Sequence, residues 1–421
     1  MLTQAPRGTK DILPEKVGTW RYVEEKIRAI CAQYGFSEIR TPIFEHTELF
    51  QRGIGDTTDV VEKEMYTFTD RGGRSLTLRP ENTASAVRAY LENKLYADAP
   101  VTKLFYIGSM FRFDRPQKGR FREFHQFGVE VLGEQSPLVD AEIIILAVRF
   151  LESLGLTDLV LSLNSVGDAQ CRSQYRAKLQ AFFQDKVEDL CEDCRSRLLR
   201  NPMRLLDCKN EKCQALSHGA PEITDCLCDD CRAHFRKVQS HLTAAGIRYT
   251  LDPRLVRGLD YYTRTAFEIK YAPLGAQSAV AGGGRYDGLI EEIGGAPTPG
   301  IGFAVGLERV MVALDMQNLA APAEETADAF LIALGDAAQQ AVFPLLIGMR
   351  DKGLRVVMDY AGRSLKSQMR AADKVRARFA VILGDTELAE HAAVLRDMRS
   401  GEQRRVPLSD LINTLCVEVK K

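Results

Sequence analysis

The stretch that decides the fold is Phe105–Gly133, FYIGSMFRFDRPQKGRFREFHQFGVEVLG. Two aromatic, β-prone runs flank the polar and basic segment RPQKGR at residues 115–120, which contains a proline and a glycine. Strand-like runs joined by a short polar segment of this kind are typical of a hairpin. The sequence therefore predicts a long antiparallel hairpin over residues 102–133, within an antiparallel sheet.

The second run of this hairpin alternates in character. Because side chains on a strand point to opposite faces with period two, alternate residues share a face. The odd-numbered positions from Phe121 to Val131 are mostly apolar. The even-numbered face holds Arg122, Phe124, Gln126, Gly128 and Glu130, and Arg112 and Asp114 are even positions of the preceding run. We expect the odd face to pack on the core and the even face to form a ligand-binding floor, the alternative being a solvated sheet face.

Toward the N-terminus, apolar residues recur at spacings of three and four over residues 14–34, which predicts an amphipathic helix that ends at Gly35. Pro42 then interrupts a strand-like run, and proline is tolerated in a strand only at an edge or a bend. In TLRPENTAS, Glu81 and Thr83 are two residues apart and could present a carboxylate and a hydroxyl to an ammonium group from an extended segment. A turn with capping residues is the alternative.

The sequence after residue 170 predicts an insertion and a separate C-terminal domain. Residues 171–246 have helical periodicity and contain eight of the ten cysteines, which indicates a helical insertion. Glycine-rich, strand-like segments then return, and beyond a linker three short apolar runs alternate with helical segments, as in a small parallel α/β domain. We therefore predict a core formed by residues 1–170 and 247–320, an insertion at residues 171–246 and a C-terminal domain at residues 326–421.

Composition leaves the choice of partner open. The 421 residues include 56 basic and 57 acidic side chains, so a nucleic-acid partner would have to be bound by local basic patches. One such patch is residues 363–378, predicted as a basic helix, with a solvated helix face as the alternative. The first residues lack an apolar signal region, and no run of about 18 apolar residues occurs, so we expect a cytoplasmic protein with no membrane partner.

The cysteines show the spacings of metal knuckles. They are Cys191-x2-Cys194, Cys208-x4-Cys213 and Cys226-x-Cys228-x2-Cys231. Thiolates at such spacings can close a tetrahedral zinc site, which predicts about one zinc ion per chain. Partly buried free thiols are the favoured alternative, so the identity of any metal stays unknown. His218, His234 and His241 are expected to be surface or packed residues.

Five segments together resemble the histidyl-tRNA synthetases, which are class II aminoacyl-tRNA synthetases. Residues 35–50, with Pro42, resemble class II motif 1, residues 105–133 resemble motif 2, and residues 299–310, with Arg309, resemble motif 3. LVRGLDYYTRTAFE at 255–268 and AVAGGGRYDGL at 279–289 resemble the two signatures specific to the histidyl enzymes. The resemblance covers essentially the whole chain.

This resemblance implies a fold and a reaction. The fold is α+β, with an antiparallel class II sheet core, a helical insertion and a C-terminal α/β anticodon-binding domain. The family joins L-histidine to histidine tRNA through a histidyl-adenylate, using ATP with Mg²⁺. The family also implies a homodimer with motif 1 at its interface, and the tip of the 115–120 loop is expected to meet the acceptor end of the tRNA.

The resemblance also assigns roles to residues of this sequence. Arg257 and Arg112 are the expected catalytic residues, with Arg112 on the α-phosphate. The substrate-binding set is Glu81, Asn82, Thr83, Arg112, Gln126, Glu130, Arg257, Tyr261 and Tyr262. Within it, Glu81, Thr83 and Gln126 would hold the α-amino group, and Glu130 and Tyr262 would read the imidazole. The ATP-binding set is Arg112, Asp114, Arg120, Phe124 and Arg309. Asp114 departs from the glutamate usual in motif 2.

Two other functions compete with this interpretation. A catalytically inert regulatory paralogue would keep the class II core but lose the adenylation arginines and the C-terminal domain, and both are present in the sequence. A zinc-ribbon RNA-binding protein would explain the cysteines and the basic helix. It would leave the polar sheet face without a purpose.

Overall fold

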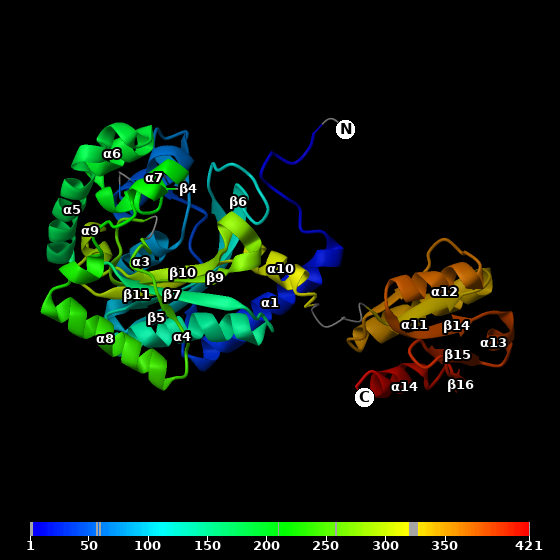
Figure 1. The fold of residues 1–421 in the computed structure, drawn as a ribbon. Coiled ribbons are helices and arrows are strands. Elements are labelled where there is room, and N and C mark those ends of the chain that lie inside the picture. The colour runs from blue at the N-terminus through cyan, green and yellow to red at the C-terminus, as the bar shows by residue number, and fades with distance from the viewer. Residues whose placement is uncertain are drawn as a thin grey trace. The chain divides into compact units, whose positions relative to one another are not determined.

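The computed structural model describes residues 3–55, 58, 60–208, 210–256, 259–319 and 327–420. The chain divides into two compact units, Met1–Ala321 and Pro322–Lys421 (Figure 1). None of the helices within the described ranges is long and apolar enough to cross a lipid bilayer.

An eight-stranded sheet forms the centre of the first unit. Its order is β1-β5-β6-β11-β10-β9-β7-β8, and the six inner strands are antiparallel. These inner strands are β5 (Thr102–Phe111), β6 (Glu123–Leu132), β11 (Gly300–Gly306), β10 (Ala279–Arg285), β9 (Thr263–Tyr271) and β7 (Leu159–Ser165). Two short edge strands, β1 (Ser37–Glu38) and β8 (Thr250–Leu251), pair parallel to their neighbours. The predicted hairpin is confirmed, because Thr102 is paired with Leu132 and Phe111 with Glu123.

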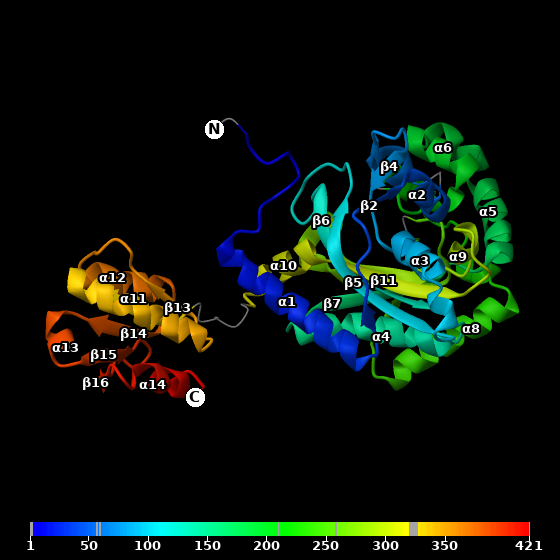
Figure 2. The same ribbon diagram turned by 180° about the vertical axis from the view of Figure 1, so that it is seen from behind.

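Helices cover the apolar face of this sheet. Figures 1 and 2 show α1 (Pro14–Gln33), α4 (Pro137–Ser153) and α8 (Asp229–Ala244) on one side of it. Their buried side chains share one core with the odd-numbered residues Phe127, Val129 and Val131 of β6, which confirms the predicted apolar face. The predicted N-terminal helix is also confirmed, and Gly35 follows it with a positive φ of 74°.

A smaller sheet and several short helices build the rest of the N-terminal part. The sheet has the order β2-β4-β3, with β2 (Phe44–His46), β4 (Ser75–Leu78) and β3 (Tyr66–Thr69). The same part of the chain contains α2 (Thr47–Ile54), the π-helical turn Val60–Glu64, α3 (Thr83–Glu92) and the 3₁₀ turn Leu95–Ala97. Pro42 lies between β1 and β2, so the run predicted as one strand is divided where the proline cannot donate a ladder hydrogen bond.

Residues 171–246 are helical, as their periodicity predicted. The segment contains α5 (Ala169–Phe183), α6 (Glu192–Arg200), α7 (Glu211–Leu216) and three 3₁₀ turns, Gln184–Asp189, Pro202–Leu205 and Ile223–Cys226. Its last helix, α8, packs into the main core through Val238 and Leu242. The chain then returns to the sheet, where α9 (Leu289–Glu292) and α10 (Leu307–Met316) follow β10 and β11.

The second unit has a mixed sheet of order β13-β12-β14-β15-β16. Its strands are β12 (Ala327–Ala333), β13 (Val356–Met358), β14 (Ala377–Leu383), β15 (Ala392–Asp397) and β16 (Gln403–Pro407). Its helices are α11 (Asp336–Asp351), α12 (Leu365–Lys374), α13 (Asp385–Ala389) and α14 (Leu411–Glu418). The three parallel strands were predicted, whereas the antiparallel pair β15–β16 was missed, because β15 has an apolar run of only four residues and β16 is mostly polar.

The predicted basic helix is shorter than its sequence suggested. Helix α12 carries Lys366, Arg370 and Lys374, but Arg376 has a positive φ and Arg378 belongs to β14. Arg363 precedes the helix and pairs with Asp359 at 3.0 Å. The extension of the helix through residue 378 was therefore wrong, because the chain turns at Arg376 to enter a buried strand.

Candidate active site

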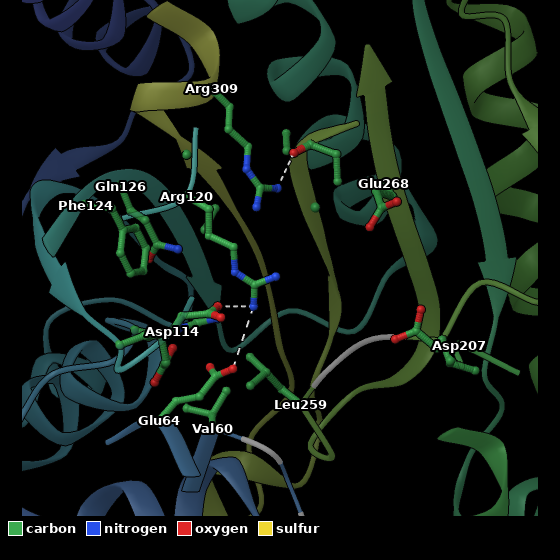
Figure 3. Close-up of a pocket in the computed structure, with 18 of the residues that line it drawn as sticks. Val60, Glu64, Asp114, Arg120, Phe124, Gln126, Asp207, Leu259, Glu268 and Arg309 are labelled. Atoms are coloured by element: carbon green, nitrogen blue, oxygen red, sulfur yellow. Dashed lines mark hydrogen bonds and ion pairs between the residues drawn. The ribbon is translucent and has the colours of Figure 1, made fainter. Parts of the chain in front are cut away.

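A pocket of about 800 Å³ opens on the polar face of the central sheet (Figure 3). Sheet residues form its floor, and the insertion contributes to its wall through Arg197, Arg204 and Asp207. The predicted site residues in its lining are Glu81, Thr83, Arg112, Asp114, Arg120, Phe124, Gln126, Tyr261, Tyr262 and Arg309. From the even-numbered face that was predicted as a floor, Phe124 and Gln126 line the pocket, whereas Arg122, Gly128 and Glu130 do not. Phe121 also lines the pocket despite its odd number, because it precedes the first residue of β6.

Behind the lining residues Thr83, Tyr106 and Tyr286, at the enclosed end of this region, lies Glu130, which is only 1% exposed and is not itself in the lining. Its Oε1 accepts hydrogen bonds from the hydroxyl of Thr83 at 2.8 Å and that of Tyr106 at 3.1 Å. Its Oε2 accepts one from the hydroxyl of Tyr286. A Cβ added at Gly302, on the neighbouring strand, would clash with this carboxylate, so the close approach of the strands requires glycine.

Burial controls the protonation of Glu130. Loss of hydration raises the pKa of Glu130 to about 8, and the negative charge of Glu81 adds to the rise, whereas the hydroxyl donors oppose it. The carboxyl group is therefore mostly neutral at pH 7 in the ligand-free pocket. A neutral carboxyl can donate one hydrogen bond as well as accept others, which suits a ligand that has both a donor and an acceptor.

Glu81 has two contacts with the start of α3. Its carboxylate accepts hydrogen bonds from the backbone N–H of Thr83 at 2.7 Å and of Ala84 at 2.9 Å. Burial raises the pKa of Glu81, and these hydrogen bonds oppose the rise. The expectation of an extended segment was wrong, because Thr83 is the first residue of the helix and Glu81 caps it. Both side chains still line the pocket.

Asn82 belongs to the supporting structure beside the pocket. Its Oδ1 accepts hydrogen bonds from the hydroxyl of Thr41 at 2.7 Å and from Arg79 at 3.2 Å, and the residue is not in the lining. Tyr261 and Tyr262 do line the pocket, with ring centroids 4.7 Å apart. Arg257, the expected catalytic arginine, lies outside the described residues, so its assignment remains a prediction.

Ion pairs occupy the open end of the pocket. Figure 3 shows Arg120 between Asp114, with which it forms a close ion pair, and Glu64, at 3.7 Å. Side chains here retain exposure of 26% for Arg120 and 17% for Asp114. The guanidinium of Arg112 lies 5.6 Å from the ring centroid of Phe124, while its Nε donates to the carbonyl of Pro80 at 2.8 Å. This end is suited to a polyanion with an aromatic base.

Arg309, at the start of α10, links two separate segments across the pocket. Its Nε donates to the carbonyl of Gly119 in the hairpin loop at 3.3 Å, and its Nη1 donates to that of Ala279 at 2.6 Å. Figure 3 draws Arg309 and Phe124 on the same pocket. The residues therefore lie where both could border a planar ligand.

Sequence reasoning missed several lining residues. Tyr106 and Tyr286 were not predicted, although Tyr106 is an even position of the predicted hairpin and could have been found by its alternation. Glu64 and Asp207 belong to segments with no periodic signal that points to the sheet.

Two groups of metal-ligating side chains lie in the insertion. One is Cys191, Cys194, Cys208 and Cys213, and the other is Asp168, Cys171, Cys228 and Cys231. Cys226 belongs to neither group, so its place in the predicted knuckles was wrong, and Asp168 and Cys171 were missed as partners. As expected for a packed residue, His234 is buried, and its Nε2 lies 2.9 Å from a carboxylate oxygen of Asp140.

Comparison with known proteins agrees with this geometry. The family model described as histidyl-tRNA synthetase matches residues 8–310, and that of an anticodon binding domain matches residues 328–417. The chain belongs to the histidyl-tRNA synthetase family. The curated histidine--tRNA ligase of Pelotomaculum thermopropionicum is 55% identical, with 99% of this chain and 98% of that protein covered. That of Clostridioides difficile is 50% identical, with 99% of each chain covered.

Solved structures show the same relationship. The apo histidyl-tRNA synthetase of S. aureus has a TM-score of 0.84 at 40% identity, covering 99% of this chain and 100% of that one. An ATP phosphoribosyltransferase regulatory subunit/histidyl-tRNA synthetase from Bacillus halodurans shares the fold, with a TM-score of 0.65 at 22% identity over 91% of this chain and 99% of that one. The expected class II fold with an anticodon-binding domain is confirmed.

Proposed function

We propose that the chain is a histidine–tRNA ligase that activates L-histidine with ATP and transfers it to histidine tRNA. A carboxylate oxygen of histidine attacks the α-phosphorus, pyrophosphate leaves, and a hydroxyl of the terminal adenosine then attacks the carbonyl carbon and releases AMP. The observation that carries the proposal is the Glu130 carboxyl, which is buried directly behind three lining residues of a large polar pocket and hydrogen-bonded to their hydroxyl groups, in a chain of this family.

The enclosed end fits the substrate imidazole. A neutral imidazole has one N–H donor and one nitrogen acceptor. Glu130, whose raised pKa leaves it mostly neutral at pH 7, offers both a donor and an acceptor and is held by three hydroxyl groups. We assign Glu130 and Tyr262 to the reading of the imidazole, with Tyr261 beside them.

The α-ammonium group would lie nearer the start of α3. The Oε1 atom of Gln126 is buried and has no hydrogen-bond partner among the described residues, which is costly unless a ligand donates to it. Glu81 and Thr83 line the same pocket and supply a carboxylate and a hydroxyl. An ammonium group provides three donors, one for each of these side chains.

ATP would occupy the open end. We assign Arg112 to the α-phosphate, Arg120 and Asp114 to the outer part of the nucleotide, and Phe124 with Arg309 to the adenine ring. Mg²⁺ would neutralise charge on the outer phosphates, near oxygen ligands of the type it prefers in Asp114 and Glu64. Arg257, by family resemblance, would contact both the histidine carboxylate and the α-phosphate.

The remaining assignments concern partners. The basic loop at residues 115–120 would meet the acceptor end of the tRNA, and the second unit would bind the anticodon, as the match to an anticodon-binding model supports. We also propose that the protein is a cytoplasmic homodimer with motif 1 at its interface.

Pyrophosphate exchange into ATP tests the activity directly. We expect exchange with histidine alone when each of the twenty amino acids is supplied separately. Exchange with another amino acid would reject the assigned specificity, and absence of exchange would favour the regulatory paralogue.

Arg257→Ala tests the assignment of the catalytic arginine. Removing one preorganised donor should slow adenylation by at least about 10²-fold, while transfer from preformed histidyl-adenylate suffers much less. The two half-reactions are measured separately by rapid quench. Intact adenylation with impaired transfer would instead place Arg257 in the tRNA step.

A further inference from the structure

The cysteines of the insertion gather in two places. Each group brings four ligand atoms within 4.8 Å of one another. The roof cluster, Cys191, Cys194, Cys208 and Cys213, has one partly buried and three buried members. The stem cluster, Asp168, Cys171, Cys228 and Cys231, has two partly buried and two buried members. Eight chemically suitable side chains from separate segments thus form two four-ligand sets, the number that a tetrahedral ion requires.

The sulfur spacing fits a shared metal ion. The Sγ atoms of Cys191 and Cys208 are 3.9 Å apart. A disulfide requires about 2.05 Å between its sulfur atoms. Two thiolates at about 2.3 Å from one tetrahedral ion lie about 3.8 Å apart, which is close to the observed separation.

Backbone N–H groups point at the sulfur atoms in both clusters. In the roof cluster, Cys213 Sγ accepts from the N–H of Cys191 at 3.3 Å, and Cys208 Sγ accepts from that of Asn210 at 3.5 Å. In the stem cluster, Cys171 Sγ accepts from the N–H of Cys228 at 3.1 Å. Such donors orient metal-bound thiolates and offset their negative charge.

Asp168 completes the stem cluster with an oxygen ligand. Its Oδ1 caps α5 by accepting from the N–H of Cys171 at 2.9 Å. Its Oδ2 lies 3.5 Å from Cys228 Sγ and is directed into the cluster. The cap therefore fixes one oxygen and directs the other toward the three sulfur atoms.

We propose that the insertion binds two Zn²⁺ ions, one held by four thiolates in the roof cluster and one by three thiolates and a carboxylate in the stem cluster. Each coordinating thiol loses its proton to solvent when the ion binds. Thiolate ligands select soft or borderline ions, and zinc binds such sites more tightly than divalent iron does.

The two ions have different structural consequences. The stem ion joins the start of α5 to the start of α8, where the chain leaves and rejoins the core. The roof ion joins the start of α6 to Cys208, which precedes α7, and to Cys213 within α7. Its ligands Cys191 and Cys208 line the pocket beside Asp207. It therefore holds a wall of the pocket in place.

Elemental analysis of the full-length protein, purified without chelator, tests the proposal. We expect two zinc ions per chain, one for each cluster, and one in either Cys213→Ser or Cys231→Ser. Cys226→Ser is the matched control, because Cys226 is also a buried cysteine of the insertion but belongs to neither cluster, and it should retain both ions. Fewer than two ions in the folded wild-type protein, iron in place of zinc, or loss of metal from the control would overturn the proposal.

Cobalt substitution covers the case in which a variant does not fold. The wild-type apoprotein should take up two equivalents of Co²⁺, with the d–d and thiolate charge-transfer absorption of tetrahedral sites, and Zn²⁺ should displace it. Absence of tetrahedral bands would overturn the proposal. Neither measurement depends on pyrophosphate exchange, so failure of the zinc sites and failure of the proposed activity are distinguishable.

Discussion

The two ends of the pocket hold their carboxylates in opposite ways. Glu130, behind the lining at the enclosed end, is 1% exposed, and its side-chain partners in the part of the chain that the structure describes are three hydroxyl groups. Asp114, at the open end, has a side chain that is 17% exposed and pairs with the guanidinium of Arg120. Hydroxyl donors in a buried site select a ligand by its shape and by its protonation state. Ion pairs beside water can instead exchange partners when a polyanion enters the pocket. Isosteric carboxylate-to-amide substitutions compare the two ends directly.

Glu130→Gln should have the largest effect. The NH₂ group of glutamine cannot accept a hydrogen bond, whereas both carboxyl oxygens of Glu130 accept from hydroxyl groups, so at least one hydroxyl would lose its acceptor and the imidazole would meet a mispaired site. We expect kcat/KM for histidine in pyrophosphate exchange to fall by at least about 10²-fold, with KM for ATP nearly unchanged. An unchanged histidine affinity would show that Glu130 does not read the imidazole.

The pH dependence of stability should give the next largest effect. In the unfolded chain Glu130 ionises near its ordinary pKa of 4.5, but in the folded chain it keeps its proton until about pH 8. Below pH 4.5 both states are protonated, so the group costs no stability there. Between these values the folded state binds more protons, so each rise of one pH unit shifts the equilibrium toward unfolding by up to about tenfold.

Glu130→Gln lacks the titrating carboxyl group, so this variant is the control for the pH dependence of stability. The stability of the variant relative to the wild-type protein should rise from about pH 5 to about pH 8, measured by urea unfolding of the ligand-free proteins. A constant difference over this range would mean that Glu130 is already ionised in the folded protein.

Asp114→Asn, the matched substitution at the open end, should have a smaller effect. It removes the charge that orients Arg120, but Glu64 remains 3.7 Å away and water reaches both groups. We expect KM for ATP to rise by up to about tenfold, with KM for histidine unchanged. An effect on histidine instead would place Asp114 in the amino-acid site.

The sequence predicted the enclosed end better than the pocket wall, for a physical reason. Alternation along β6 is a local property of a strand, so Gln126 and Glu130 could be assigned to one face from the order of their residues alone. Arg204 and Asp207 reach the pocket only because the insertion folds back over the sheet, and that contact leaves no periodic signal.

The cysteines show the same limit. Local spacing identified the knuckles at Cys191 and Cys228, but the partition into two clusters depends on which distant segments meet. Asp168 joins the stem cluster from outside any cysteine pattern, and Cys226 is left out although its spacing fits. In the second unit, likewise, β15 pairs with β14 and β16 pairs with β15, and the local sequence of these two strands did not indicate either pairing.

Glu64→Gln should produce the smallest effect and thereby separates the two carboxylates that flank Arg120. The Arg120–Glu64 pair, at 3.7 Å, is longer than a normal hydrogen bond, whereas Asp114 makes the close contact. Partly exposed pairs at such distances contribute little, so we expect KM for ATP to change by no more than about threefold. The measurement is pyrophosphate exchange at saturating histidine over a series of ATP and Mg²⁺ concentrations. If Glu64 instead ligates the magnesium that accompanies ATP, the variant will require far more Mg²⁺ at an unchanged histidine KM, and Glu64 then acts on the metal and not on Arg120.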